Sequence, residues 1–458
     1  MTRKAGVQWA NPTSSATPDA FFALVITLAL FLPLTAADLY LSADRSGILP
    51  VNATYISFIS VSFVFGTIFL AELACDRGRN LLSYYALAAP ILFVLALLTI
   101  VQTCGAFLPS ANSSYGGRYI YFALYSFVLY CFSVGIASFP AFRRYHRGIL
   151  SVSLFGAAGS IFVNLAYPQI FLSNFLERGS GFEANPNHAA MIVGILAIAT
   201  VDWTRSRCGD MFLWLFAGVA VAATLSRGGM ILLMIAFLYY AAVTARLEPN
   251  RFRKNISVLL ATIPGVVAVY FASNLGSTVY SSDNDRIRSL ASLLGGDTTT
   301  VLHDSRVALV SEYIGLISER PIFGYGTGMV MSRAPGPHNM FLTLWLENGI
   351  FGLMAYLMVL VGCFWHFRKK GDSRGQAFSV ALFVFSFFSH NLLNSSSRPI
   401  YVTLGLLSGM VVSVVGSKSA HSVATVGITG PFFEPTTGSS PSAPVVRGLS
   451  ADFGRRFL

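Results

Sequence analysis

Long apolar segments constrain this chain more than any other feature of its sequence. We count twelve of them, approximately at residues 20–37, 55–73, 81–103, 119–139, 149–168, 188–201, 211–225, 229–245, 256–274, 340–366, 376–393 and 400–416. Lipid offers no hydrogen bonds to a backbone, so a segment that enters it satisfies its own N–H and C=O groups as a helix. The sequence therefore predicts an all-α polytopic membrane protein with about 12 transmembrane helices, in which the segment 340–366 is kinked.

The composition agrees with this class of protein. Hydrophobic residues make up 54% of the 458 positions and charged residues 11%, whereas about 25% of the residues in a soluble domain are charged. The net charge of +11 could indicate a protein that binds nucleic acid. The cations are spread over separate loops between the apolar segments, however, which argues against nucleic acid as a partner. We expect membrane lipids to surround the chain instead.

The distribution of lysine and arginine predicts how the chain is oriented in the membrane. With the N-terminus inside, every lysine lies on the cytoplasmic side: Lys4, Lys254, Lys369, Lys370 and Lys418. The cations outside are then all arginines: Arg45, Arg118, Arg178, Arg227, Arg286, Arg288, Arg306, Arg320, Arg333 and Arg398. A guanidinium binds a phosphate through two hydrogen bonds and keeps its charge, although any single arginine here could merely cap a helix or reach towards the interface.

This orientation divides the chain into four parts. Residues 1–275 contain the first nine transmembrane helices, and residues 276–337 form one long, partly helical periplasmic loop that is rich in Arg and Asp. Residues 338–416 contain the last three helices. Residues 417–458 are rich in Ser, Gly, Pro and Thr, which predicts a disordered cytoplasmic tail.

The long loop contains one predicted helix. Asp304 or Ser305 can cap it, Pro321 ends it, and its apolar residues recur at helical spacing: Val310, Ile314 and Ile317. Arg306 lies near its start, where a helix N-terminus and a guanidinium together suit an anion, although a solvated charge is the alternative. The glycine-rich run 324–328 follows, and we expect either a flexible connector or a nest of N–H groups for a phosphate.

A second candidate site element joins two apolar segments at the outer face, at residues 224–229. Ser226 and Arg227 stand there in front of Gly228 and Gly229. Glycines let a backbone approach a ligand closely while the guanidinium supplies a fixed positive charge. The alternative is a tight hairpin with an arginine that reaches towards the interface.

The third element begins at His338 and Asn339, at the start of an apolar segment that also contains Glu347. Pro337 at the first helical position makes His338 an early-turn residue. A neutral imidazole accepts a proton near pH 7, although a lone histidine can equally be structural. Glu347 stands in apolar surroundings, so it must be paired or protonated.

The stretch Asn185-Pro186-Asn187 precedes the sixth apolar segment. It is typical of a turn followed by a helix start, and it could also line a mouth at the outer face. The five cysteines have neither a pair outside the membrane nor the spacing of a metal site.

Together these motifs resemble the O-antigen ligase and Wzy-type polymerase family. The resemblance covers roughly 185–355 and rests on four motifs in the same order: Asn185-Pro186-Asn187, Ser226-Arg227-Gly228, the Arg306 helix that leads into residues 319–326, and His338-Asn339 followed after nine residues by Gly349-x-x-Gly352.

The resemblance implies a GT-C type glycosyltransferase of the bacterial inner membrane that works at its periplasmic face without a metal or cofactor. Its donor would be a saccharide on undecaprenyl diphosphate. Its acceptor would be a sugar hydroxyl, on lipid A-core for a ligase or on another lipid-linked glycan for a polymerase. His338 would be the base, and Arg227 and Arg306 would bind the diphosphate.

Further residues would support the site or face the acceptor: Asn339, Glu347, Ser226, Asn187 and Arg288. The spacing leaves open whether Arg306, Arg286 or Arg288 is the second diphosphate arginine. It also leaves ligase and polymerase open, although the spacing from His338 to Gly352 favours a ligase.

Two other classes of function remain as alternatives. A polysaccharide flippase or another transporter usually carries charges at the membrane midplane and shows internal repeats. This chain has no detectable repeat, and no apolar segment has a charge near its middle, except for Glu347 close to the outer end. A scaffold without catalytic activity is the third class.

Overall fold

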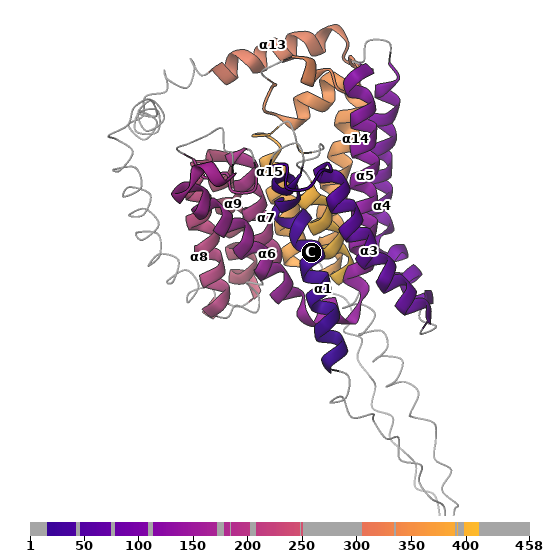
Figure 1. The fold of residues 1–458 in the computed structure, drawn as a ribbon. Coiled ribbons are helices and arrows are strands. Elements are labelled where there is room, and N and C mark those ends of the chain that lie inside the picture. The colour runs from indigo at the N-terminus through magenta and orange to yellow at the C-terminus, as the bar shows by residue number, and fades with distance from the viewer. Residues whose placement is uncertain are drawn as a thin grey trace, which may run out of the picture. The chain divides into compact units, whose positions relative to one another are not determined.

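The computed structural model describes residues 16–42, 46–74, 78–108, 113–171, 178–183, 185–201, 208–247, 249–250, 305–333, 336–389, 392 and 398–411. Within these ranges every regular element is a helix (Figure 1). The predicted segment 256–274, residues 276–304 and 334–335 of the predicted loop, and the predicted tail 417–458 lie outside the described residues.

The described residues up to 247 form these elements: α1 (Ala16–Thr35), α2 (Ala37–Leu41), α3 (Ala53–Ala74), α4 (Gly78–Ala106), α5 (Ser113–Ser138), α6 (Pro140–Ala166), the short η2 (Pro168–Phe171), α7 (Pro186–Thr200), α8 (Cys208–Ala223) and α9 (Arg227–Leu247). The described residues from 305 on form α13 (Ser305–Glu319), the short η4 (Val330–Ser332), α14 (Met340–Lys370), α15 (Ser373–Phe385) and a helix at residues 398–411.

Six of the described helices are long and apolar enough to cross a membrane: α3, α4, α5, α6, α9 and α14. The apolar part of α1, together with α7 and α8, is shorter. Each predicted segment that lies within the described residues coincides with a helix, although α15 ends at Phe385 rather than near 393. The all-helical membrane class is therefore confirmed, and the number of crossings stays a prediction.

Helix α7 lies in the middle of this arrangement. Its side chains from His188 to Thr200 are all buried, and it contacts α6, α8, α9 and α15. A helix that is apolar on every side needs neighbours on every side, which explains why this short segment lacks a polar face. The start of α7 is thereby held in a fixed position among the other helices.

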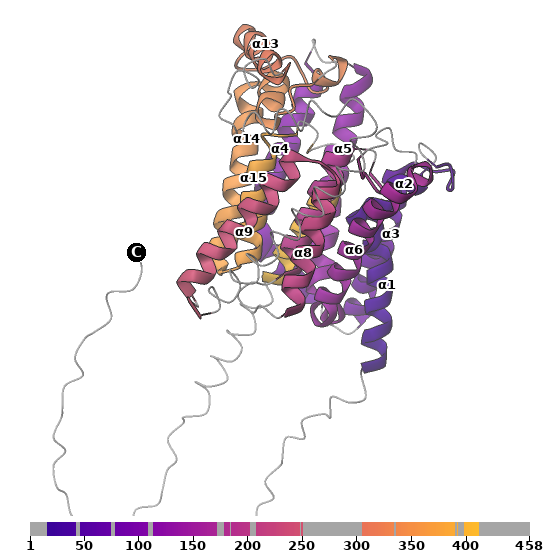
Figure 2. The ribbon, with the colours of Figure 1, turned by 90° about the vertical axis from the view of Figure 1, so that its left-hand side faces the viewer.

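Basic residues occur near the start of α6 and in the last turn of α14, at an end of the helices that we call the basic end. Figure 2 shows these helices from the side. Arg147 at the start of α6 forms an ion pair with Asp210 at the start of α8, and Arg144 lies 3.4 Å from Asp19 of α1. Lys369 and Lys370 lie in the last turn of α14, where a positive charge interacts favourably with the helix dipole. The positive-inside rule predicts that such an end faces the cytoplasm.

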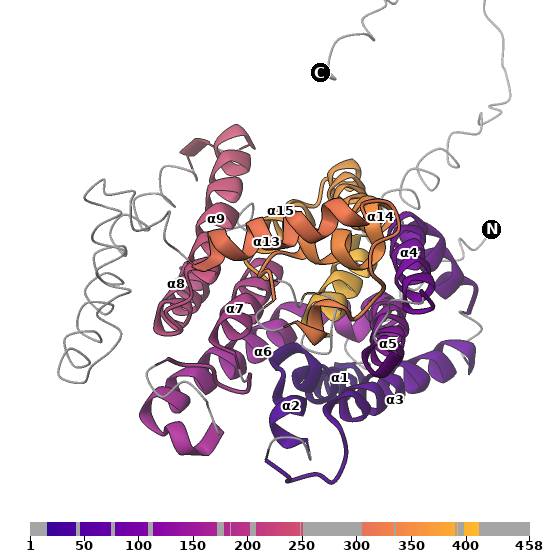
Figure 3. The ribbon, with the colours of Figure 1, turned by 90° about the horizontal axis from the view of Figure 1, so that it is seen from above.

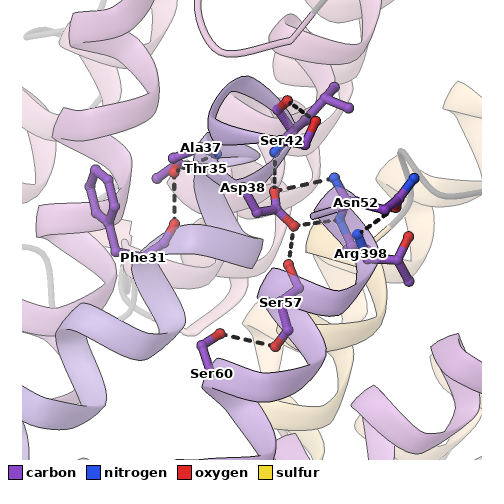
Figure 4. Close-up of polar contacts among 11 residues, drawn as sticks. Phe31, Thr35, Ala37, Asp38, Ser42, Asn52, Ser57, Ser60 and Arg398 are labelled. Atoms are coloured by element: carbon purple, nitrogen blue, oxygen red, sulfur yellow. Dashed lines mark hydrogen bonds and ion pairs between the residues drawn. The ribbon is translucent and has the colours of Figure 1, made fainter. Parts of the chain in front are cut away.

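A fully buried ion pair lies at the opposite end, which we call the site end. Asp38 of α2 and Arg398 are 0% and 1% exposed, and Arg398 Nε lies 2.9 Å from Asp38 Oδ2 (Figure 4). Ser57 of α3 donates to the same carboxylate, and Arg398 Nη2 donates to Oδ1 at 3.2 Å. The pair therefore ties α2 and α3 to the helix at residues 398–411.

Helix α14 reverses direction at Gly349, where the backbone adopts φ 63° and ψ −160°. The rings of Phe341 and Tyr356 lie 5.8 Å apart, whereas these positions would be about 22 Å apart along a straight helix. Residues 340–348 therefore form a short arm that folds back on a long arm, residues 350–370. Gly352 permits this contact, because a Cβ there would lie 2.8 Å from the carbonyl oxygen of Leu344. The predicted kink is in fact a reversal.

The described part of the predicted loop packs on the short arm. Tyr313 and Ile317 of α13 are buried together with Val330 and Leu346, and Figure 3 shows α13 beside α14. Helix α13 ends at Glu319, before Pro321, as predicted. The predicted apolar stripe is wrong in detail, because Ile314 is 53% exposed while Leu309 and Leu316 join Tyr313 and Ile317.

Residues 321–330 brace the reversal by hydrogen bonds. The N–H groups of Tyr325 and Gly326 donate to the carbonyls of Leu346 and Glu347, both at 2.8 Å. On the other side of the loop, Thr327 Oγ1 donates to the Gln102 carbonyl of α4 at 2.8 Å and accepts from Asn348 at 2.7 Å. The loop therefore fixes the turn of α14 against the end of α4.

Candidate functional site

His338 stands just outside α14 rather than in its first turn. The helix begins at Met340, and Asn339 is its N-cap, because the Asn339 side chain accepts hydrogen bonds from the N–H groups of Phe341 (2.9 Å) and Leu342 (3.2 Å). His338 adopts φ 48°, a left-handed conformation that is rare for residues other than glycine. The prediction that Pro337 opens the helix is wrong, because the asparagine side chain caps it two residues later.

A second imidazole, that of His188, interacts electrostatically with His338. His188 lies in the first turn of α7 and is 6% exposed. Asn185 caps α7 by accepting a hydrogen bond from the N–H of Asn187 at 2.9 Å. The predicted turn and helix start are therefore confirmed, and they bring the start of α7 to the His338 turn.

Arg227 is the first residue of α9, and its side chain is exposed. Ser226 caps the helix, because Ser226 Oγ accepts from the N–H of Gly229 at 3.1 Å. Leu225 precedes them with φ 51°, a second left-handed residue that is not glycine. Ser226 is 1% exposed, so its role in the structure is to cap α9, the helix that begins with Arg227.

One short segment contacts both the Arg227 turn and the His338 turn. The N–H of Met340 donates to the carbonyl of Ser386 at 2.8 Å. Gly228 lies against Phe385 and Phe388, and a Cβ on Gly228 would come within 3.0 Å of Phe388 Cβ. The end of α15 therefore brings the two motifs together, although about 110 residues separate them in the sequence. These contacts are made by the last residue of α15, Phe385, and by the residues that directly follow the helix.

Asn187 is held by an arginine from another element. Arg178 Nη2 donates to Asn187 Oδ1 at 3.2 Å, and the same guanidinium reaches the turn before Arg227. The amide oxygen of Asn187 is thus directed at the protein.

Glu347 supports the reversal of α14. It is 1% exposed, and its Oε1 accepts a hydrogen bond from the N–H of Val330 at 3.1 Å. The glycine-rich run 324–328 has a similar role, since its N–H groups at Tyr325, Gly326 and Thr327 donate to carbonyls of the protein. The run is a brace for α14, not a flexible connector, and those three groups are not directed at an anion.

The second arginine of the predicted site stays untested. The backbone of Arg306 lies in the first turn of α13, but its side chain lies outside the described residues. Arg286 and Arg288 lie outside them entirely. No group of three His, Cys, Asp or Glu side chains that could hold a metal occurs in the part of the chain that the structure describes.

Two residues of this region were not expected from the sequence. Arg178 was one of ten outside arginines with nothing to distinguish it, and His188 was part of a helix start. Their partners come from other helices, so no spacing within one segment could have indicated them. The available sequence signal was a polar residue, His188, at the start of an otherwise apolar segment, because a polar group there needs a partner.

Comparison with known proteins identifies one family that is similar to part of the chain. No curated protein matches the chain. A family model described as O-antigen ligase matches residues 211–357, which contain most of α8, all of α9 and α13, the short arm of α14 and the first turns of its long arm. This region holds both Arg227 and His338. The resemblance indicated by the motifs is therefore confirmed: residues 211–357 are similar to the O-antigen ligase family.

Proposed function

We propose that this protein transfers a saccharide from an undecaprenyl-diphosphate donor to an acceptor sugar hydroxyl, as an O-antigen ligase of the bacterial inner membrane. The observation that carries the proposal is the convergence of the Arg227 turn and the His338 turn on residues 385–388. Both turns lie within residues 211–357, the region similar to that family, whereas residues 385–388 follow it in the sequence. Such a transfer requires a base and a fixed cation in one site, and the two turns supply one of each.

His338 is the base in this proposal. A neutral ring nitrogen of His338 takes the proton of the acceptor hydroxyl while that oxygen attacks the anomeric carbon of the donor sugar. The bond between the anomeric carbon and the diphosphate oxygen breaks as the new glycosidic bond forms. Attack from the side opposite the diphosphate inverts the anomeric centre, and undecaprenyl diphosphate leaves.

Arg227 stabilises the leaving group. Negative charge grows on the diphosphate as the glycosidic bond breaks, and the exposed guanidinium stands at the start of α9, where the helix dipole also favours an anion. A second arginine shares this task, and Arg306, Arg286 and Arg288 are the candidates. Two guanidinium groups then replace a metal ion, so we propose transfer without a metal or cofactor.

Purified protein in lipid nanodiscs tests the proposal. Incubated with an undecaprenyl-diphosphate glycan and lipid A-core, the wild type should release undecaprenyl diphosphate and form a glycosylated lipid A-core of inverted configuration. EDTA should leave the rate unchanged within about twofold, because no metal takes part. Loss of donor without a glycosylated product, or no reaction at all, would contradict the proposal.

Deletion of the gene separates a ligase from a Wzy-type polymerase. A strain without a ligase should lose all glycan attached to lipid A-core and accumulate long lipid-linked chains. A strain without a polymerase should keep a single attached repeat or lose a secreted polymer. A flippase is distinguished in vesicles, where it would move the lipid-linked glycan across the membrane without breaking its diphosphate bond.

We also propose that the site end faces the periplasm, where the lipid-linked donor is available to such enzymes. The Lys and Arg side chains at the basic end support this orientation. The absence of lysine from the segments predicted to lie outside supports it as well. Residues 276–337 would then form the periplasmic loop above the site.

A further inference from the structure

The segment 178–183, between α6 and α7, is fixed to the end of α6. Asn164 of α6 accepts hydrogen bonds through Oδ1 from the N–H groups of Ser180 (2.7 Å) and Gly181 (3.2 Å). Ser160 Oγ accepts from the N–H of Phe182 at 3.3 Å. This segment is mostly buried, and it presents Arg178 towards the turn between α8 and α9.

The guanidinium of Arg178 holds that turn by its backbone. Nε donates to the carbonyl of Thr224 at 2.9 Å, and Nη2 lies 3.4 Å from the carbonyl of Leu225. The neighbouring N–H of Gly179 donates to the carbonyl of Ala223 at 3.3 Å. The last carbonyls of a helix have no partner within the helix, and a cation there also interacts favourably with the helix dipole. Arg178 therefore completes the end of α8.

The same guanidinium reaches the start of α7. Nη2 donates to Asn187 Oδ1 at 3.2 Å, and the next residue along the chain is His188, the electrostatic neighbour of His338. Arg178 thus connects the α8–α9 turn, which carries Arg227, with the helix start that approaches His338. The rigid, planar fork of an arginine holds several donors in fixed directions, which suits one side chain that contacts both elements.

The turn that Arg178 holds is strained. Leu225 adopts φ 51°, which costs a residue with a side chain roughly 1–2 kcal/mol. A backbone of this kind persists only where surrounding contacts determine it. Leu225 is followed by the cap Ser226 and then by Arg227, so its conformation sets the direction in which α9 begins.

We propose that Arg178 is a positioning residue for Arg227: it locks the strained turn and the start of α7, and so aims the Arg227 guanidinium at the diphosphate. Arg178 is 8% exposed and directs its donors at protein oxygens, so it does not bind the substrate itself. This inference rests on the proposed function and adds a residue that the family motifs do not contain.

A double-mutant cycle with Arg227 tests the inference in the purified, full-length protein. Arg178→Gln in the wild type should lower turnover roughly 10–100-fold, because a small displacement of a catalytic group has effects of that size. In the Arg227→Ala background the same change should lower turnover less than about twofold, because no guanidinium remains to be positioned. Equal losses in both backgrounds would overturn the inference.

Two further variants make the cycle specific. Arg178→Lys keeps the charge but lacks the fork, so it should recover less than half of the lost activity, and full recovery would overturn the inference. Arg147→Gln is the control, since it breaks an interhelix ion pair at the basic end. Its effect should be the same in both Arg227 backgrounds, and a non-additive effect like that of Arg178→Gln would overturn the inference.

Hydrogen–deuterium exchange gives a readout that does not need activity. In Arg178→Gln, or in Arg178→Lys if the former does not fold, the amides of residues 223–230 should exchange at least about tenfold faster, while those of α13 stay unchanged. Unchanged exchange at residues 223–230 would overturn the inference. If the wild type transfers no glycan, the proposed function fails, and the exchange result still decides whether Arg178 holds the turn.

Discussion

Leu225 and His338 both have left-handed backbone conformations, with φ 51° and 48°. Each directly precedes a polar cap, Ser226 or Asn339, that starts a helix beside the candidate site. A left-handed residue lets the chain turn sharply into the cap, at a cost of roughly 1–2 kcal/mol. Strain of this kind is typical of functional sites, where the geometry of a side chain matters more than its local stability.

At this scale, Arg227→Lys tests what the guanidinium contributes. Lysine keeps the positive charge but loses the planar fork, so this variant should be nearly as damaging as Arg227→Ala, with turnover lower by ~10²–10³. Arg333→Ala is the matched control, because Arg333 is exposed in the same region and contacts neither motif turn through its described hydrogen bonds. Steady-state rates of purified variants decide, and full activity in Arg227→Lys would mean that the position supplies only positive potential.

Among the elements, α14 links the loop subdomain to the site. The nine residues between Asn339 and Gly349 are the short arm, and Gly352 lets the two arms touch. The spacing of the motif thus has a structural reason. The length of the short arm determines which part of the long arm His338 lies beside. Loop residues 321–330 and Glu347 fix the reversal from the other side.

Replacement of Gly349 should therefore disable the site from a distance. Gly349→Ala places a Cβ against the carbonyl of Ile322 in a backbone region that is essentially reserved for glycine. We expect a loss of stability of at least about 1–3 kcal/mol, seen as a lower Tm in detergent, and a lower turnover in the protein that stays folded.

Gly315→Ala is the control for this prediction. Gly315 lies within α13 with nothing within 4 Å of its added Cβ, so alanine there should raise stability by about 0.5–1 kcal/mol. An unchanged Tm in Gly349→Ala would mean that the reversal is not required for the fold.

The sequence predicted the apolar segment of α14 and a kink in it, but not the reversal. Hydropathy reports that a segment is apolar and not which way its backbone runs. The angle at Gly349 depends on Pro321, whose carbonyl accepts from the N–H of Ile350, and on the other loop contacts. Those contacts exist only after the loop has folded against the short arm.

For the whole molecule, the Asp38–Arg398 pair joins the beginning of the chain to its last described helix. Arg398→Met leaves an uncompensated charge at a site with no solvent, which typically costs about 3–5 kcal/mol. Adding Asp38→Asn removes that charge, so the double variant should be more stable than Arg398→Met alone. Thermal unfolding of the three proteins tests this, and a double variant that is no more stable would contradict it.

Stability of Arg398→Met should also depend on pH. Burial raises the pKa of Asp38, and the charge of Arg398 opposes that rise in the wild type. Without Arg398 the folded protein binds a proton at Asp38 more tightly than the unfolded chain does, so stability should increase as the pH falls towards the unfolded pKa. Equal Tm values at pH 8 and pH 5, relative to wild type, would contradict this.

The orientation of the whole molecule is testable by cysteine labelling in a background without native cysteines. Ser318→Cys on α13 should react with an impermeant reagent in cells whose outer membrane is permeable, and Lys369→Cys should not. Both positions are exposed, so access to the reagent and not burial decides the outcome. The reverse pattern would place the site end in the cytoplasm and remove the proposed donor.

The candidate site was only partly predictable. His338 and Arg227 were expected because they belong to motifs with recognisable spacing, and the structure brings the turns that carry them to residues 385–388. Asn339 and Ser226 were expected as site residues, but their side chains cap helices. Arg178 could not be predicted, because its role arises from three elements that meet only in the folded protein.

The central claim, that His338 is the base, is tested most directly with purified His338→Ala in nanodiscs, matched to wild type for folded protein. Turnover on an undecaprenyl-diphosphate glycan should fall by ~10²–10⁴, while donor binding stays within about threefold, because the imidazole does not hold the diphosphate. Wild-type activity should also decline on the acid side of neutrality, as a protonated imidazole cannot accept a proton. Near-wild-type turnover in His338→Ala would contradict the account.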